Sequence, residues 1–206
     1  MKVHGNVKPD EISTNVMPNK PGRAWVRFCL NPVETTDVDG NPQWKYDEYV
    51  TEIADGSDLQ ACVIEQADAL LLQAVGEEYG VSMTTVDDLR EQRITDSKTD
   101  LAVWLADNPM TWTDGKKYAV TSEKQAQLTS ALAVQQVALT AGVERELRWN
   151  STGDECTVWN YNDLCALALG IAAYVEPRVS IQQAAEVELR KATTAKEVLA
   201  VAWNYA

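Results

Sequence analysis

The spacing of apolar residues changes along this 206-residue chain from the period of a strand to that of a helix. Residues 25–30 are apolar on both sides of an extended chain, and residues 43–53 alternate between apolar and charged side chains. With the connection 31–42, these two stretches predict a β-hairpin. From residue 59 to residue 74, apolar side chains recur every three or four positions, which predicts a helix. Strands followed by helices predict an α+β fold.

The first 22 residues contain several prolines and show no sustained apolar period. Proline fixes φ and removes a backbone donor, so residues 1–22 are predicted to form an extended arm rather than a helix or a central strand. Such an arm has too few large apolar residues to hold itself in place. We therefore expect it to lie along a partner protein, as an added edge strand, with Met17, Pro18 and Pro21 among the contact residues.

The middle of the chain is predicted to be helical and acidic. A capping-box pattern begins at Ser57 ahead of the first helix, and shorter helical stretches follow at residues 85–93 and 99–106. Residues 1–110 carry 9 basic and 20 acidic groups, whereas residues 111–206 carry 9 and 11. This difference in charge supports a boundary near residue 110. The predicted parts are an arm at 1–22, a hairpin with helices at 23–109, and a helix-rich α+β domain at 110–206.

Turn and cap residues mark the elements of the second half. Asp114-Gly115 predicts a tight hairpin turn, Gly142 predicts a helix end, and Pro177 predicts a kink or break in a long apolar helix. In order, the expected elements are a hairpin at 110–120, a helix at 122–141, strands at 144–150 and 156–161, helices at 163–175 and 181–192, and a short helix after a capping box that begins at Thr194.

Composition disfavours several classes of function. The chain has 18 basic and 31 acidic residues, a formal net charge of −13, which disfavours binding to nucleic acid or to an anionic membrane surface. The apolar stretch 164–175 is shorter than a membrane-spanning helix, and the first residues lack the apolar run of a signal peptide. The four cysteines form no CxxC motif, and phosphate-binding glycine motifs are absent. No metal or cofactor is therefore predicted.

Two groups of residues are candidates for a chemical site. Asp37, Asp39, Asn41 and Glu48 have the spacing of calcium ligands in an EF-hand, but Pro42 stands where the sharp turn needs glycine, so a hairpin turn is favoured. His4, the only histidine, falls in the predicted arm. A nucleophilic triad would have to recruit it from there, so no catalytic residue is predicted.

The sequence contains seven tryptophans and seven tyrosines but one phenylalanine, so tryptophan and tyrosine dominate its aromatic residues. Both side chains combine an apolar body with a polar tip, which suits interfaces as well as cores. Four of the tryptophans fall in predicted strands, where packing in the fold is the favoured role: Trp25, Trp44, Trp149 and Trp159. Trp203 and Tyr205 lie in the last turn of the chain, where an exposed aromatic pair is expected to be an assembly contact.

The order of three blocks in the second half is similar to a known protein family. The blocks are the segment GKKYAVTSEKQAQLTSAL at 115–132, the segment RWN at 148–150 followed by a Leu-Ala-Leu-Gly helix, and KATTAKE at 191–197. Residues 115–201 resemble a domain of unknown function found at the C-terminus of bacteriophage tail and tail-fibre-associated proteins. More weakly, residues 25–53 resemble the hairpin of short phage tail-module proteins.

This resemblance implies a non-enzymatic structural component of a phage tail, in the tip, the baseplate or a fibre adaptor. Its partners would be other tail proteins and copies of itself, and it would reside in the virion after assembly in the host cytoplasm. The alternative is a tail-fibre assembly chaperone that binds fibre proteins transiently. The resemblance brings no catalytic residue to this chain.

Overall fold

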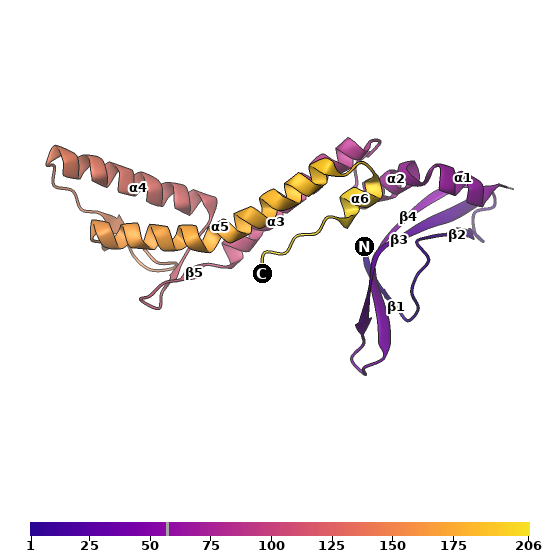
Figure 1. Ribbon diagram of the computed structural model, residues 1–206, viewed down its shortest axis with the longest axis horizontal. Coiled ribbons are helices and arrows are strands. Elements are labelled where there is room, and N and C mark those ends of the chain that lie inside the picture. The colour runs from indigo at the N-terminus through magenta and orange to yellow at the C-terminus, as the bar shows by residue number, and fades with distance from the viewer. Residues whose placement is uncertain (57) are drawn as a thin grey trace. The chain divides into compact units, whose positions relative to one another are not determined.

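A computed structural model describes residues 1–56 and 58–206 (Figure 1). The described chain forms two compact units. Unit 1 consists of Met1–Ile94 and Val187–Ala202, and unit 2 consists of Thr95–Glu186 and Trp203–Ala206. A four-stranded antiparallel sheet precedes several helices and two short hairpins, which confirms the predicted α+β class.

The sheet of unit 1 has the strand order β1-β4-β3-β2, with every neighbouring pair antiparallel (Figure 1). The predicted hairpin is present as its two central strands, and both strands are longer than predicted. The strand bounds are β1 Lys2–Gly5, β2 Ile12–Val16, β3 Arg23–Thr36 and β4 Pro42–Ala54. The register shifts between Leu30 and Val33, where Asn31 adopts a positive φ of 54°, as at a β-bulge.

The prediction of a separate arm at residues 1–22 is wrong. Within these residues, β1 pairs with β4 and β2 pairs with β3, so the segment supplies both edge strands of the sheet. Met17 is buried, and its N–H donates to the carbonyl of Arg23 at 2.9 Å. Pro9, Pro18 and Pro21 lie between strands, where a missing backbone donor removes no ladder hydrogen bond.

Helices cover one face of this sheet. α2 (Ala67–Tyr79) packs on β4, and α6 (Ala195–Ala200) packs on β3 and on α2. α1 (Leu59–Glu65) precedes α2, and the non-helical backbone of Gln66 divides the single helix that the sequence predicted. Asp58 is the N-cap residue of α1 and makes no side-chain cap hydrogen bond, while Ser57, the predicted capping residue, lies outside the described residues.

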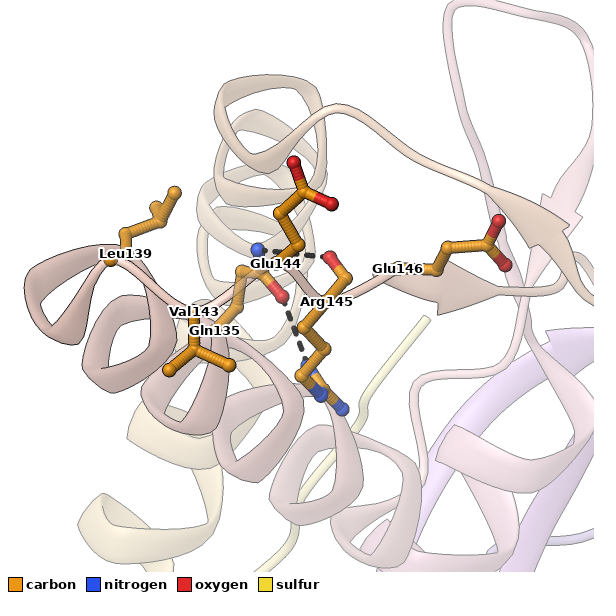
Figure 2. A pocket seen from close by; sticks show the side chains of 7 residues that line it. Gln135, Leu139, Val143, Glu144, Arg145 and Glu146 are labelled. Carbon is orange, nitrogen blue, oxygen red and sulfur yellow. Dashed lines mark hydrogen bonds between the residues drawn. The ribbon is translucent and has the colours of Figure 1, made fainter.

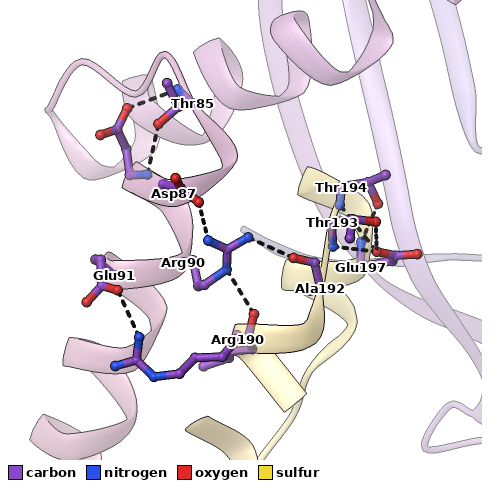
Figure 3. Close-up of polar contacts among 11 residues, drawn as sticks. Thr85, Asp87, Arg90, Glu91, Arg190, Ala192, Thr193, Thr194 and Glu197 are labelled. Atoms are coloured by element: carbon purple, nitrogen blue, oxygen red, sulfur yellow. Dashed lines mark hydrogen bonds and ion pairs between the residues drawn. The ribbon is translucent and has the colours of Figure 1, made fainter. Parts of the chain in front are cut away.

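Unit 1 also contains the start of α3 (Val86–Asp107) and the end of α5 (Tyr161–Lys191), which an arginine joins (Figure 3). The guanidinium of Arg90 donates to the carbonyl of Leu189 at 3.1 Å and to that of Ala192 at 2.8 Å, and it pairs with Asp87. Carbonyls at the end of a helix lack partners within that helix. Arg90 therefore satisfies carbonyls where α5 ends.

Unit 2 is built from two small hairpins and the remaining helical segments. The hairpins are β5 (Met110–Thr111) with β6 (Lys117–Tyr118), and β7 (Arg148–Trp149) with β8 (Thr157–Val158). α4 (Ser122–Ala141) begins at a Thr121 cap and ends at Gly142, which has a φ of 67°. The core contains buried residues from all of these parts: Leu105, Met110, Tyr118, Val120, Leu128, Leu147, Leu164, Leu167, Ile171 and Val175.

Two helices differ from the prediction. α3 is one helix rather than two, and α5 continues across Pro177, so of the predicted kink or break the break is wrong, and the kink stays a prediction. Next to the proline, the Arg178 guanidinium donates to the Tyr174 carbonyl at 3.0 Å and adds a hydrogen bond on this turn. The compact units also do not follow the predicted boundary near residue 110, because α3 and α5 contribute to both.

Candidate functional site

A cluster of polar side chains joins the two hairpins of unit 2. Asp154 accepts from Lys116 at 2.8 Å and from the Ser151 hydroxyl at 2.5 Å. The hydrogen bond from Lys116 lowers the pKa of Asp154, and the same contact raises the pKa of Lys116. A base with a lowered pKa and an amine with a raised pKa are both poorly tuned for acid–base catalysis at neutral pH. The cluster instead fastens one hairpin to the other.

The same cluster contains a phenol that is also held in one protonation state. Tyr118 is buried, and its hydroxyl donates to the Asp114 carboxylate at 2.8 Å. Burial above all, with this hydrogen bond, raises the pKa of Tyr118 to about 12. The phenol therefore keeps its proton across the neutral range and secures the turn of the β5–β6 hairpin.

The four residues with EF-hand spacing are not gathered around one point. Asp37 accepts hydrogen bonds from the backbone N–H groups of Asp39 and Asn41, at 2.9 and 2.8 Å, and from the Asn41 side chain at 3.0 Å. The side-chain bond from Asn41 is the main cause that lowers the pKa of Asp37. Glu48 lies further along β4 and pairs with Arg27 at 3.4 Å. These contacts describe a hairpin turn, as the sequence favoured.

The lone histidine is exposed on β1, with its Nδ1 3.0 Å from the side-chain oxygen of Gln43. Among residues 1–56 and 58–206, no group of three His, Cys, Asp or Glu side chains is placed to hold a metal ion. All four cysteines are free thiols, and burial is the main cause that raises the pKa of Cys29.

The most distinctive surface of the chain is the solvent side of α4. Residues 125–143 contain no Asp, Glu, Lys or Arg, although such residues make up 24% of the sequence. Four large apolar side chains on this segment are at least half exposed: Val134 (52%), Val137 (68%), Leu139 (52%) and Val143 (59%). An exposed helix of a soluble domain normally carries charged residues on its solvent side.

The other side of α4 is packed in the usual way. Leu128, Gln135 and Ala138 are buried in unit 2, so α4 has a well-defined inner side. On the outer side, small and apolar residues recur at intervals of three or four positions: Ala126, Ser130, Ala133, Val134, Val137 and Ala141. Residues with this spacing share one helix face. We call these six residues the α4 seam.

A hollow of about 620 Å³ lies at the C-terminal end of α4 (Figure 2). Leu139 and Val143 give it an apolar wall, and the buried amide of Gln135 accepts from the Arg145 guanidinium at 3.1 Å. Within the described part of the chain, Arg145 forms no ion pair. Glu144 and Glu146 line the same hollow, so its margin carries two carboxylates beside one guanidinium, and the uncharged surface of α4 ends there.

The predicted contact residues occupy other positions than expected. Met17 is buried, whereas Pro18 and Pro21 are exposed in the turn between β2 and β3. Tyr205 is also buried, and its hydroxyl donates to the Ser97 carbonyl at 2.8 Å, so the expected exposed aromatic pair at the C-terminus is wrong. Contact of Pro18 and Pro21 with a partner stays a prediction.

The half-buried Trp203 belongs to the same C-terminal segment, and its ring N–H donates to Asp100 at 2.9 Å. The indole and the Tyr205 phenol are therefore both hydrogen-bonded to α3. The aromatic residues were predicted as contact residues from their position in the sequence, whereas the α4 surface was not predicted. The signal for that surface was present as nineteen consecutive uncharged residues behind a strong helix cap.

By length and composition alone, α5 could cross a membrane, and it is the one such helix in the part of the chain that the structure describes. Leu164, Leu167, Ile171 and Val175, which supply much of its apolar character, are buried in the core of unit 2. A core helix of a soluble domain passes the same test of length and composition, but such a helix is mostly buried, whereas 22% of the apolar span of α5 is buried. The apolar character of α5 is thus accounted for in part by packing.

No family model, curated protein or solved structure matches this chain. The polar groups described above form turns, caps and ion pairs, whereas the exposed apolar side chains of α4 are left uncovered by the fold.

Proposed function

We propose that this protein is a non-enzymatic structural component of a bacteriophage tail that acts through protein–protein contacts. The observation that carries the proposal is the exposed surface of α4 from residue 125 onward, which is free of charge in a chain of net charge −13. Contiguous apolar surface on an otherwise polar protein is typical of an interaction site. The resemblance of residues 115–201 to phage tail-associated proteins supplies the biological setting, at the tail tip, the baseplate or a fibre adaptor.

The chemistry of the polar groups supports a structural role. Lys116, Ser151 and Asp154 bond to one another across two hairpins, and Asp114 holds a phenol. Groups that a catalyst would need to move protons near neutral pH are here held in one protonation state. Their arrangement stabilises the two hairpins beside α4.

The uncharged surface suits a contact inside a large assembly. Burying an ionised side chain at an interface costs free energy unless it is paired, and the α4 seam offers no such group. Apolar and small residues can be covered without that cost, so the surface needs only shape complementarity from its partner. Repeated contacts in a multi-copy particle strengthen an interface that is weak between two molecules.

The proposal is tested by quantitative mass spectrometry of particles purified from the phage that encodes the chain. Recovery in a fixed ratio to known tail proteins is the expected result. Recovery in complexes with fibre proteins from the infected lysate, but not in particles, would instead establish the assembly-chaperone alternative. Absence from both the particles and such complexes would overturn the proposal.

A further inference from the structure

We infer that the α4 seam is the contact surface for a second copy of this chain, packed as an antiparallel helix pair about a two-fold axis. The inference rests on the proposed function only in that both assign protein contact to α4. The partner is a second copy of the chain, and the residues that meet are those of the α4 seam.

Charge is the first argument for a second copy. Each molecule carries a formal net charge of −13, so two copies that met through carboxylate-rich surfaces would repel each other. The seam lies within residues 125–143, which carry no charge at all. A two-fold contact uses the same patch on both molecules, so the patch has to be compatible with itself. The neutral seam meets this condition.

The spacing within the seam is the second argument. In an antiparallel pair with its axis between Ala133 and Val134, Ala126 faces Ala141 of the other copy and Ser130 faces Val137. Smaller side chains thus stand opposite larger ones near the centre, and alanines meet at the ends. Small residues allow two helices to approach closely, and the recurring separation of three and four residues is that of a packed helix seam.

The size of the seam sets the strength of the contact. A helix of 20 residues is roughly 30 Å long and about 10 Å wide, which gives a contact strip on the order of 300 Å². Stable complexes bury about 800 Å² on each partner. We therefore expect a weak, reversible dimer that forms at high protein concentration, as in a particle where copies are held close together.

Sedimentation equilibrium of the full chain, from micromolar to millimolar concentration, tests the inference with a matched pair of variants. Val137→Glu places a carboxylate in the seam, and Gln136→Glu adds the same charge at the adjacent exposed position outside the seam. An unpaired buried charge costs enough to weaken dimerisation by about tenfold or more in Val137→Glu, whereas Gln136→Glu should stay within about twofold of the parent. Circular dichroism checks that both variants keep the parent fold.

A double variant tests the register. Ser130→Lys with Val137→Glu places each new ammonium opposite a new carboxylate of the other copy, because residues 130 and 137 face each other across the axis. The double variant should regain at least half of the dimer affinity that is lost in Val137→Glu alone. Added salt should reduce this gain, because it screens the new ion pairs. Failure to recover would overturn the antiparallel register.

Other outcomes separate this inference from the proposed function. A parent protein that stays monomeric up to millimolar concentration would overturn the second copy as the partner, and so would equal dimerisation of Val137→Glu and Gln136→Glu. Neither result would affect recovery of the protein from purified particles. A dimer that depends on Val137 in a protein absent from particles would retain this inference and remove the proposed function.

Discussion

Replacing Gly170 by alanine should destabilise unit 2, although alanine is the better helix former. Gly170 lies in α5 beneath the indole of Trp112. A Cβ at this position would stand 2.9 Å from Cη2 and 3.1 Å from Cε3 of that ring, and closer still to Cζ3. The ring is rigid and packs against the core of unit 2, so it cannot yield as the end of a flexible side chain would.

Two opposing effects set the change in the free energy of unfolding caused by Gly170→Ala. Glycine to alanine in a helix interior gains about 1 kcal/mol of stability. Inserting a methyl group into a filled space costs about 1–3 kcal/mol. We expect the clash to win, with a net loss of about 1 kcal/mol. In a Trp112→Ala background the ring is absent, so the same substitution should gain about 1 kcal/mol.

Urea unfolding followed by far-ultraviolet circular dichroism measures all four members of this double-mutant cycle. Ala173→Gly, at an exposed position of α5, is the matched control and should lose about 1 kcal/mol from helix propensity alone. If Gly170→Ala stabilises the parent protein as much as it stabilises the Trp112→Ala variant, then the indole does not fill the space above Gly170.

Other predictions concern the edge strands, a cap and the alkaline limit of stability. Met17→Ala should cost about 2–5 kcal/mol in urea unfolding because this side chain is buried, whereas exposed Pro18→Ala should change stability by less than about 1 kcal/mol; equal effects would contradict the burial. Thr194→Ala should lose about 1 kcal/mol with the capping box of α6, and thermal melts that coincide with the parent would contradict this. Burial is the first cause that raises the pKa values of Tyr118 and Tyr205 to about 12. Phenols titrate near pH 10 in the unfolded chain, so their contribution to stability is present below about pH 10 and is lost as the pH rises to about 12. Phenolate absorbance that rises fully near pH 10 in the folded protein would contradict this prediction.

The sequence predicted correctly the helix caps and turns that are formed by residues close together in the chain. Thr121 caps α4, Gly142 ends it in a left-handed conformation, and Asp114-Gly115 makes the β5–β6 turn, all as the sequence indicated. The capping box at Thr194 is present with both of its hydrogen bonds. Each of these devices involves residues within about five positions of one another, so the sequence alone contains the information.

The edge strands depended on contacts that the local sequence does not contain. β1 and β2 are short, and each is stabilised by hydrogen bonds to a central strand, with Val3 opposite Tyr46 and Thr14 opposite Val26. Prolines near a segment exclude a helix, but they do not exclude an edge strand that stops before them. The absence of an apolar period was therefore a poor guide to whether residues 1–22 join the fold.

The continuity of α3 was missed for a related reason. Its middle lacks a regular apolar face because Ser97, which is fully buried, meets a polar partner rather than an apolar one. The Gln182 amide donates to the Ser97 hydroxyl at 3.2 Å, and the Tyr205 hydroxyl donates to the Ser97 carbonyl. Buried polar residues that are hydrogen-bonded belong to the core, but apolar periodicity cannot identify them.

The surface of α4 shows why composition had to be joined to burial before function could be inferred. By sequence alone, Val134 and Val137 are as suitable for the core as Leu128, because α4 carries no charged residue on any side from residue 125 onward. The structure divides these residues: Leu128 is 3% exposed, whereas Val137 is 68% exposed. An amphipathic helix turns its charged face to water, but this part of α4 has no charged face. Apolar side chains are therefore exposed wherever no other element covers the helix. Unit 2 covers one half of α4, and the seam on the other half is the surface that a second chain would have to cover.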